Sequence, residues 1–131
     1  MPELWVAQLG TIAYQEAFAL QRTLCERRGA GELPDVLLVL EHQPVYTKGK
    51  RTEPADLPMG EDWYGLQGIE VCETDRGGRV TYHGPGQLVA YPIVRVARVR
   101  AYVEALEAAM VEALADEGVI AEPRSTPQVG V

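Results

Sequence analysis

The residues that could take part in chemistry are concentrated between Arg76 and Pro92, a glycine-rich stretch of the 131-residue chain. It reads RGGRVTYHGPGQLVAYP and carries Arg76 and His83 near the two ends of a β-type run at residues 80–82. Glycine permits positive φ angles and lets a ligand approach the backbone closely. The pattern therefore predicts a strand, a tight turn and a second strand at residues 88–91, arranged as the wall of a pocket.

Two stretches of the chain resemble the lipoyl(octanoyl) transferase family. The first is DRGGRVTYHGPGQLVAYP, from Asp75 to Pro92, and the second is EHQPVYTKG, from Glu41 to Gly49. Two long motifs in this order are far more specific than a lone glycine-rich loop. The resemblance runs from about Leu37 to the last residue and is weaker over the first helix. It implies transfer of an octanoyl (or lipoyl) group from acyl carrier protein to a lysine of a lipoyl domain.

The resemblance also implies a substrate-binding stretch, made of Arg76, Gly77, Gly78, Arg79, Val80, Thr81, Tyr82 and His83. Acyl transfer needs donors for a developing oxyanion, and the backbone N–H groups of the two glycines can approach a thioester carbonyl. Val80 and Tyr82 would line an octanoyl chain if they point inward, in which case Thr81 points to the opposite face. Plain core packing is the alternative interpretation of Tyr82.

The two charged or titratable side chains of this stretch each have a second interpretation. Arg76 either fixes the pocket mouth or contacts a phosphopantetheine arm, or it forms a surface ion pair with Glu73 or Asp75. His83 either orients a neighbour or moves a proton, or it is a histidine satisfied within its own turn. The resemblance favours the functional interpretation of Arg76.

The family's nucleophilic cysteine, and the lysine that lowers its pKa, match positions beyond Val131. Cys25 and Cys72 do not stand where the family places its nucleophile, and Lys48 and Lys50 are the only lysines. We therefore expect residues 1–131 to be one N-terminal portion of the catalytic domain, without catalytic residues and inactive alone. An ATP-dependent lipoate–protein ligase and a non-catalytic fragment that binds acyl chains or carrier protein are the alternatives.

Composition restricts the classes of partner. The net charge of -7 argues against nucleic acid, yet residues 76–100 hold five arginines and no acid. This island is either a solvated face or a dock for acidic partners, namely octanoyl-acyl carrier protein and the lipoyl domains of 2-oxoacid dehydrogenases and glycine cleavage H protein. No apolar run reaches membrane-spanning length, and the cysteines fit no disulfide or metal pattern, so a cytoplasmic protein without metal or ATP is expected.

The elements that must position these residues follow from periodicity. Residues 4–9 predict a strand closed by Gly10, and Thr11 caps a helix with Ala13, Ala17, Leu20 and Leu24 on its apolar face, ending at Gly29. The run at residues 36–40 predicts a strand buried on both faces, with Glu41 and His42 at its end. We interpret His42 as a structural histidine that bonds a nearby loop.

The remaining segments complete the predicted fold. Residues 48–62 predict a loop without an element, interpreted as a lid, and residues 68–74 predict a strand that contains Cys72 as a packing residue. A helix from Val99 stops at Gly118, strands begin at Val119 and at Val129, and the cut-off last strand leaves an edge for weak dimerisation. The fold class is α/β (α+β), a mixed sheet flanked by helices, and the resemblance implies a biotin/lipoate protein ligase-like fold, incomplete at the C-terminus.

Overall fold

The computed structural model describes residues 2–124 and 129–131. The chain forms two compact units, Met1–Val94 and Arg95–Val131. The first unit contains β1 (Leu4–Ile12), α1 (Tyr14–Gly29), β2 (Asp35–His42), β3 (Val45–Lys48), the 3-10 helix η1 (Pro54–Asp56), α2 (Glu61–Leu66), β4 (Glu70–Glu73), β5 (Val80–His83) and β6 (Val89–Ile93). The second unit contains α3 (Val99–Asp116).

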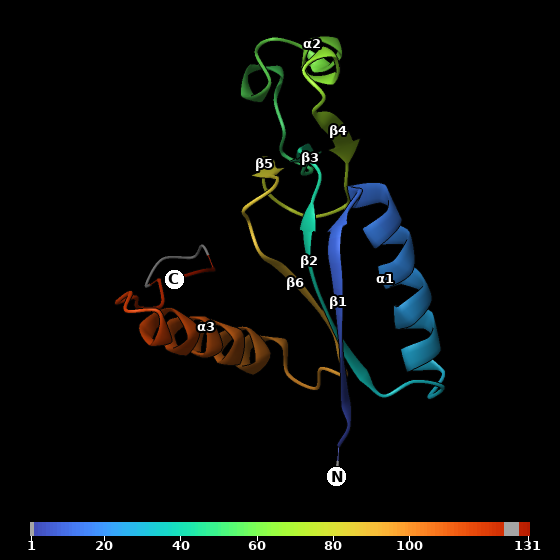
Figure 1. Cartoon of the computed structure of the whole chain (residues 1–131), viewed down its shortest axis with the longest axis vertical. Helices are drawn as coiled ribbons and strands as arrows, with labels where there is room; N and C mark the ends of the chain where they lie inside the picture. Colours follow the sequence, from blue (N-terminus) through green and yellow to red (C-terminus); the bar gives the residue numbers. More distant parts are fainter. Residues whose placement is uncertain (1, 125–128) are drawn as a thin grey trace. The chain divides into compact units, whose positions relative to one another are not determined.

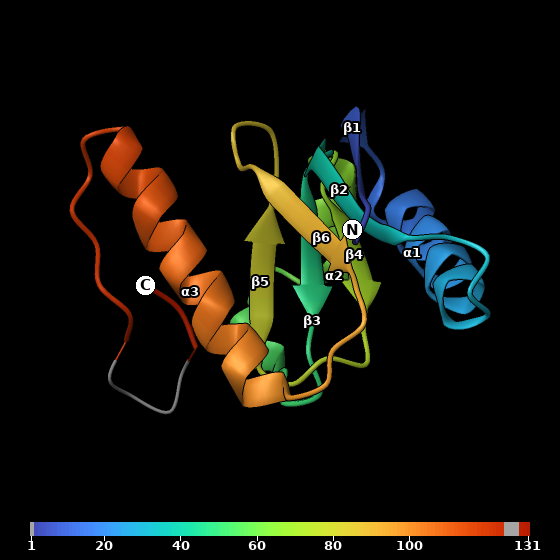
Figure 2. The same ribbon diagram turned by 90° about the horizontal axis from the view of Figure 1, so that it is seen from below.

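The strands of the first unit form two three-stranded sheets, both of mixed direction. In the first sheet β2 lies between β1, to which it is parallel, and β6, to which it is antiparallel. In the second sheet β3 lies between the parallel β4 and the antiparallel β5. Figure 2 shows β3 and β5 running in opposite directions beside each other. The predicted mixed α/β class is confirmed, although the strands divide into two sheets.

Helix α1 packs along the first sheet and forms the core with it (Figure 1). Ala17 is fully buried, and its small side chain meets Val36, Leu38 and Leu40 on β2. The prediction that β2 is buried on both faces is wrong, because burial alternates strictly along the strand. Among the described residues α1 covers one face of this sheet. A continuous apolar run does not indicate whether one face or both faces of a strand are covered.

The chain enters α1 later than the sequence indicated. Thr11 is not the helix cap: β1 continues to Ile12, and Ala13 precedes the helix without a side-chain capping bond. Gly10, with a φ of 66°, lies where the register between β1 and β2 shifts, so it forms a bulge and does not end the strand. Pairing with β2 therefore outweighs the capping propensity of Thr11. Gly29 ends the helix as predicted.

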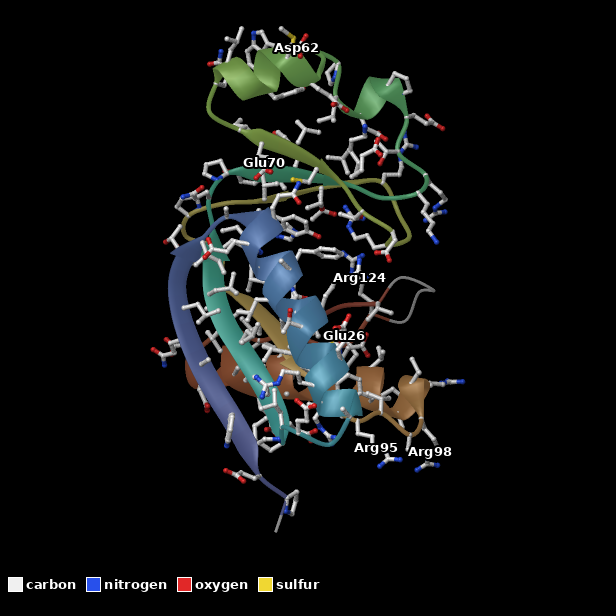
Figure 3. All side chains as sticks on the ribbon, turned by 90° about the vertical axis from the view of Figure 1, so that its right-hand side faces the viewer. Glu26, Asp62, Glu70, Arg95, Arg98 and Arg124 are labelled. Atoms are coloured by element: carbon white, nitrogen blue, oxygen red, sulfur yellow. The ribbon has the colours of Figure 1, made fainter. Side chains whose placement is uncertain are left out.

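The segment predicted as a loop, residues 48–62, contains η1 and the first two residues of α2. Glu53 and Asp56 form a capping box around η1, and α2 begins at Glu61. Leu57, which follows η1, and Tyr64 on α2 are both buried, and Tyr64 packs on Tyr46 of β3. Figure 3 shows Asp62 on α2 and Glu70 on β4 at the same end of the first unit. The prediction of no regular structure here is wrong.

The second unit consists of α3 and the residues after it. Gly118, with a φ of 77°, follows the end of α3 as predicted, and Val119 N–H donates to Leu114 O at 2.8 Å. Residues 119–120 form no strand, and neither do residues 129–131, so both strand predictions are wrong for the described part. Ile120 is fully exposed, which removes the burial that would stabilise a strand. No helix of the described residues has the length and apolarity to span a bilayer.

Candidate functional site

The two motifs predicted from the sequence lie against each other in the first unit. Gly49 N–H donates to Arg79 O at 3.0 Å, Lys50 N–H to Arg76 O at 3.0 Å, and Arg51 N–H to Gly78 O at 2.9 Å. A Cβ atom on Gly49 would lie 2.3 Å from the carbonyl oxygen of Gly78. Glycine at position 49 is therefore what allows the two backbones to approach this closely.

Arg76 holds the glycine-rich loop against β3. Its Nη2 donates to the carbonyl oxygen of Thr47 at 2.6 Å and to the hydroxyl of Thr47 at 2.7 Å, and its Nη1 donates to Gly77 O at 3.0 Å. Among the residues that the structure describes, Arg76 forms no ion pair, so the alternative pairing with Glu73 or Asp75 is absent. Within the described residues Arg76 is therefore held by backbone and hydroxyl oxygens and not by a carboxylate.

The loop presents unused backbone donors. Within the described part of the chain, the N–H groups of Gly77 and Gly78 donate to no protein acceptor. Gly78 has a φ of 86°, and a Cβ on Gly77 would meet nothing within 4 Å. Two adjacent open N–H groups beside an arginine are suited to a carbonyl oxygen that gains negative charge.

The side chains of β5 alternate between two faces, so the predicted binding residues do not share one surface. Thr81 and His83 pair with Thr47 and Val45, whereas Val80 and Tyr82 pair with Lys48 and Tyr46. The ring of Tyr82 lies 5.3 Å from that of Tyr46, which also contacts Tyr64 of α2. Tyr82 therefore packs on the face covered by α2. The alternation predicted for Thr81 is present, but a ligand cannot contact Val80, Tyr82 and His83 from one side.

A buried histidine lies next to His83. His42 is 0% exposed, its Nδ1 lies 3.1 Å from Ile12 O, and its Nε2 accepts a hydrogen bond from the Tyr91 hydroxyl at 2.7 Å. Burial lowers the pKa of His42, so its ring is held neutral. The ring lies 6.0 Å from that of His83. The interpretation of His42 as structural agrees with these bonds, although its partners are on β1 and β6 and not in a loop.

Tyr14 and Gln15, at the start of α1, contact His42 at the end of β2 and Cys72 on β4. The ring of Tyr14 lies 5.3 Å from that of His42, and burial raises the pKa of the Tyr14 hydroxyl. Gln15 donates to the sulfur of Cys72 at 3.5 Å. Burial raises the pKa of Cys72 to about 12, so this thiol stays protonated and is a packing group, as interpreted from the sequence.

Arg79 ties the glycine-rich loop to η1. Its guanidinium donates to both oxygens of Asp56, the shortest contact being 2.7 Å, and to Glu53 at 3.1 Å. The hydrogen bond from Arg79 lowers the pKa of Asp56. Beside this cluster is a hollow of about 340 Å³, lined by Lys48, Thr52, Glu53, Pro54, Leu57, Gly60 and Glu61. The segment predicted as a lid is therefore held by an ion pair.

The structure adds residues that sequence reasoning did not single out. Thr47 supplies both acceptors for Nη2 of Arg76, and the rings of Tyr91 and Tyr14 contact that of His42. Thr47 lies inside the second motif, and the two-residue period of β3 already separates it from Tyr46. No pattern in the sequence points to Tyr14, because its proximity arises only when α1 packs on the sheet.

Comparison with known proteins gives a consistent family. The lipoyl protein ligase A/B catalytic domain family matches residues 13–131. An octanoyltransferase of Corynebacterium glutamicum (strain R) is 47% identical over 129 residues, which cover 96% of this chain and 49% of the relative. An octanoyltransferase of Mycobacterium leprae (strain Br4923) is 50% identical over 116 residues, covering 86% and 47%. The chain spans about half the length of these curated relatives.

Solved structures agree at the level of the fold. Lipoate-protein ligase A bound with ATP aligns with a TM-score of 0.66 and 18% identity, covering 98% of this chain and 53% of that one. A bi-partite lipoate protein ligase from Thermoplasma acidophilum aligns with a TM-score of 0.64 and 18% identity, covering 95% and 49%. The predicted biotin/lipoate ligase-like fold is thereby confirmed.

Proposed function

The chain belongs to the lipoyl protein ligase A/B catalytic domain family, and from that membership we propose that it forms the acyl-binding part of an octanoyltransferase. A cysteine thiolate outside residues 1–131 attacks the thioester of octanoyl-acyl carrier protein and releases the carrier thiol. A lysine amine of a lipoyl domain then attacks the enzyme thioester, forms an amide and releases the cysteine thiol. In this proposal residues 1–131 belong to one catalytic domain.

One observation carries this proposal: the unused N–H groups of Gly77 and Gly78 lie at a loop whose position is fixed by Arg76 and Thr47. Donors that are already in place stabilise an oxyanion without reorganisation during the reaction. Thr81 and His83 lie on the Thr47 side of the second sheet, which makes that side the proposed ligand surface. Val80 and Tyr82 then lie on the opposite face of β5, where Tyr82 packs on Tyr46, and Arg79 is bonded to Asp56 of η1.

The nucleophile is proposed to lie outside these 131 residues because neither described cysteine suits the role. Cys72 is buried and its pKa is raised to about 12, and Cys25 is exposed on α1. A catalytic thiol needs a lowered pKa. The octanoyltransferase names of the curated relatives support the reaction, and we further propose acyl carrier protein, lipoyl domains and a cytoplasmic location as its setting.

An acyl-transfer assay tests the proposal. Octanoyl-acyl carrier protein and an apo lipoyl domain are incubated with the 131-residue chain or with the full-length protein. The mass of the lipoyl domain is then measured by mass spectrometry. We expect an octanoyl adduct with the full-length protein and none with the 131-residue chain. Arg76→Gln should reduce the adduct, and Arg27→Gln, at an exposed ion pair on α1, is the matched control.

Three outcomes would contradict the proposal. Adduct formation by the 131-residue chain alone would show that its own residues include the nucleophile. Product that depends on ATP and free octanoate, and not on the carrier thioester, would instead identify a lipoate–protein ligase. Saturable binding of carrier without product from the full-length protein would favour a non-catalytic binder.

A further inference from the structure

Gln87 follows the turn after His83, and its side chain reaches back to the histidine. Nδ1 of His83 lies 2.5 Å from Oε1 of Gln87. The other end of the same amide, Nε2 of Gln87, lies 3.4 Å from the carbonyl oxygen of Tyr82. One glutamine side chain thus contacts both the ring of His83 and the backbone immediately before it.

The turn between the two residues has a fixed geometry. Gln87 N–H donates to Gly84 O at 3.1 Å, Pro85 occupies the second position, and Gly86 occupies the third with a φ of 90°. This combination is that of a type II turn, in which only glycine takes the third position easily. Gly86 N–H also donates to a carboxylate oxygen of Glu41 at 3.1 Å. Gln87 is therefore held at a defined distance from His83.

These contacts decide which way the amide of Gln87 points. A backbone carbonyl only accepts hydrogen bonds, so the NH₂ group of Gln87 must face Tyr82 O. The reversed amide would set two oxygens against each other. Oε1 consequently faces Nδ1 of His83, which must carry the hydrogen. A neutral imidazole has one ring hydrogen, so Nε2 keeps its lone pair.

We infer that Gln87 is a positioning residue that sets the tautomer of His83, with the hydrogen on Nδ1 and the lone pair on Nε2. Among the described residues Nε2 of His83 has no hydrogen-bond partner, so this acceptor is available to a ligand. If the proposed acyl-transfer function holds, this nitrogen accepts a hydrogen bond from an N–H or S–H group of the ligand. The tautomer itself does not depend on that function.

Long-range ¹H–¹⁵N correlation spectra of the histidine rings test the inference, at a pH well above about 6.5 where free histidine is neutral. The chain has only two histidines. His42 is an internal reference, because its Nδ1 faces the Ile12 carbonyl, which only accepts. We expect His83 to show a protonated Nδ1 and an unprotonated Nε2. Gln87→Glu keeps the acceptor and should keep this tautomer.

Gln87→Leu removes the acceptor and should move the His83 hydrogen to Nε2, while Gln67→Leu, at an exposed position after α2, should leave it on Nδ1. Two results would overturn the inference: a wild-type His83 with its hydrogen on Nε2, or a Gln87→Leu variant that retains Nδ1–H. The wild-type spectrum alone is decisive if a variant does not fold. An inactive enzyme with the expected tautomer would refute the proposed function and not this inference.

Discussion

Single residues at the contact between the two motifs determine the shape of the candidate site. Arg76 has no acidic partner among the described residues, and its guanidinium is satisfied by Thr47 and Gly77. Such charge-assisted bonds are stronger than neutral ones, so they hold the loop without neutralising the arginine. The close approach of Gly49 to Gly78 belongs to the same contact. The site is thus built from backbone as much as from side chains.

Replacing Gly49 by alanine tests that backbone contact. The new Cβ would lie 2.3 Å from Gly78 O, so the loop must shift, and we expect the free energy of unfolding to fall by roughly 1–3 kcal/mol. Gly65→Ala on α2 is the control, because its Cβ meets nothing within 4 Å and alanine favours a helix by about 0.5–1 kcal/mol. Urea denaturation measures the free energy of unfolding of both variants. A Gly49→Ala variant as stable as the wild type would contradict the close approach of Gly49 to Gly78.

His42 should make stability depend on pH. Burial lowers its pKa in the folded state below the unfolded value of about 6.5, so the unfolded chain binds the proton more readily. The stabilisation is complete above about pH 6.5 and is lost as the pH falls toward the lowered pKa. We expect His42→Gln to lose part of the decrease in stability between about pH 7.5 and pH 5.5. Denaturant titrations at both values measure this, and an unaltered pH dependence would contradict it.

At the scale of elements, the segment between β3 and β4 is fastened to the signature loop by charge. Arg79 links β5 to η1 through Asp56 and Glu53, and Lys48 links β3 to Glu61 of α2. Each pair has at least one side chain that is more than half exposed, so salt screens their attraction. The segment is therefore the part of the first unit whose attachment should respond most to ionic strength.

Arg79→Gln should loosen this segment without unfolding the core. The variant removes the pairs with Asp56 and Glu53, so we expect faster amide hydrogen exchange over residues 50–60 and little change in α1. High salt should reproduce the effect in the wild type. Arg27→Gln, which removes an exposed pair with Glu32, is the matched control. Equal amide exchange in wild type and Arg79→Gln would show that the ion pairs of Arg79 do not hold the segment.

The sequence predicted those elements that depend on local pattern. The strands around His83, the strand with Cys72, the core face of α1 and the extent of α3 follow from periodicity and glycine positions. The elements that failed depend on pairing or on burial: Thr11 became strand by pairing with β2, and residues 119–120 lack burial. The site was predicted as one stretch, whereas the two-residue period divides it between two faces.

At the scale of the whole molecule, β1 is an outer strand with exposed apolar side chains. Leu4, Trp5 and Val6 are each at least 50% exposed, and in the described part of the chain β2 is the one strand that pairs with β1. Residues 129–131 form no strand, so the edge on which weak dimerisation was predicted is not present in the described part. Strand addition between copies is therefore proposed at β1.

A lysine on this edge tests self-association. Charged side chains discourage edge-to-edge pairing, so we expect Val6→Lys to lower the dimer fraction in sedimentation velocity. Leu66→Lys, at another highly exposed apolar position, should leave the dimer fraction unchanged. A wild-type chain that is monomeric at all concentrations would end the proposal.

The most direct test of the proposed ligand surface is a titration of the ¹⁵N-labelled chain with octanoyl-pantetheine. This small thioester can bind without reacting, so the catalytic cysteine is not required. We expect the amide signals of Gly77 and Gly78 and the ring signals of His83 to shift in a saturable manner, because these residues belong to the proposed ligand surface. We also expect little change at Tyr64 of α2, which packs on Tyr46 at the opposite face of the second sheet. Shifts confined to Tyr46, Tyr64 and Tyr82, or no shifts at all, would contradict the proposed ligand surface.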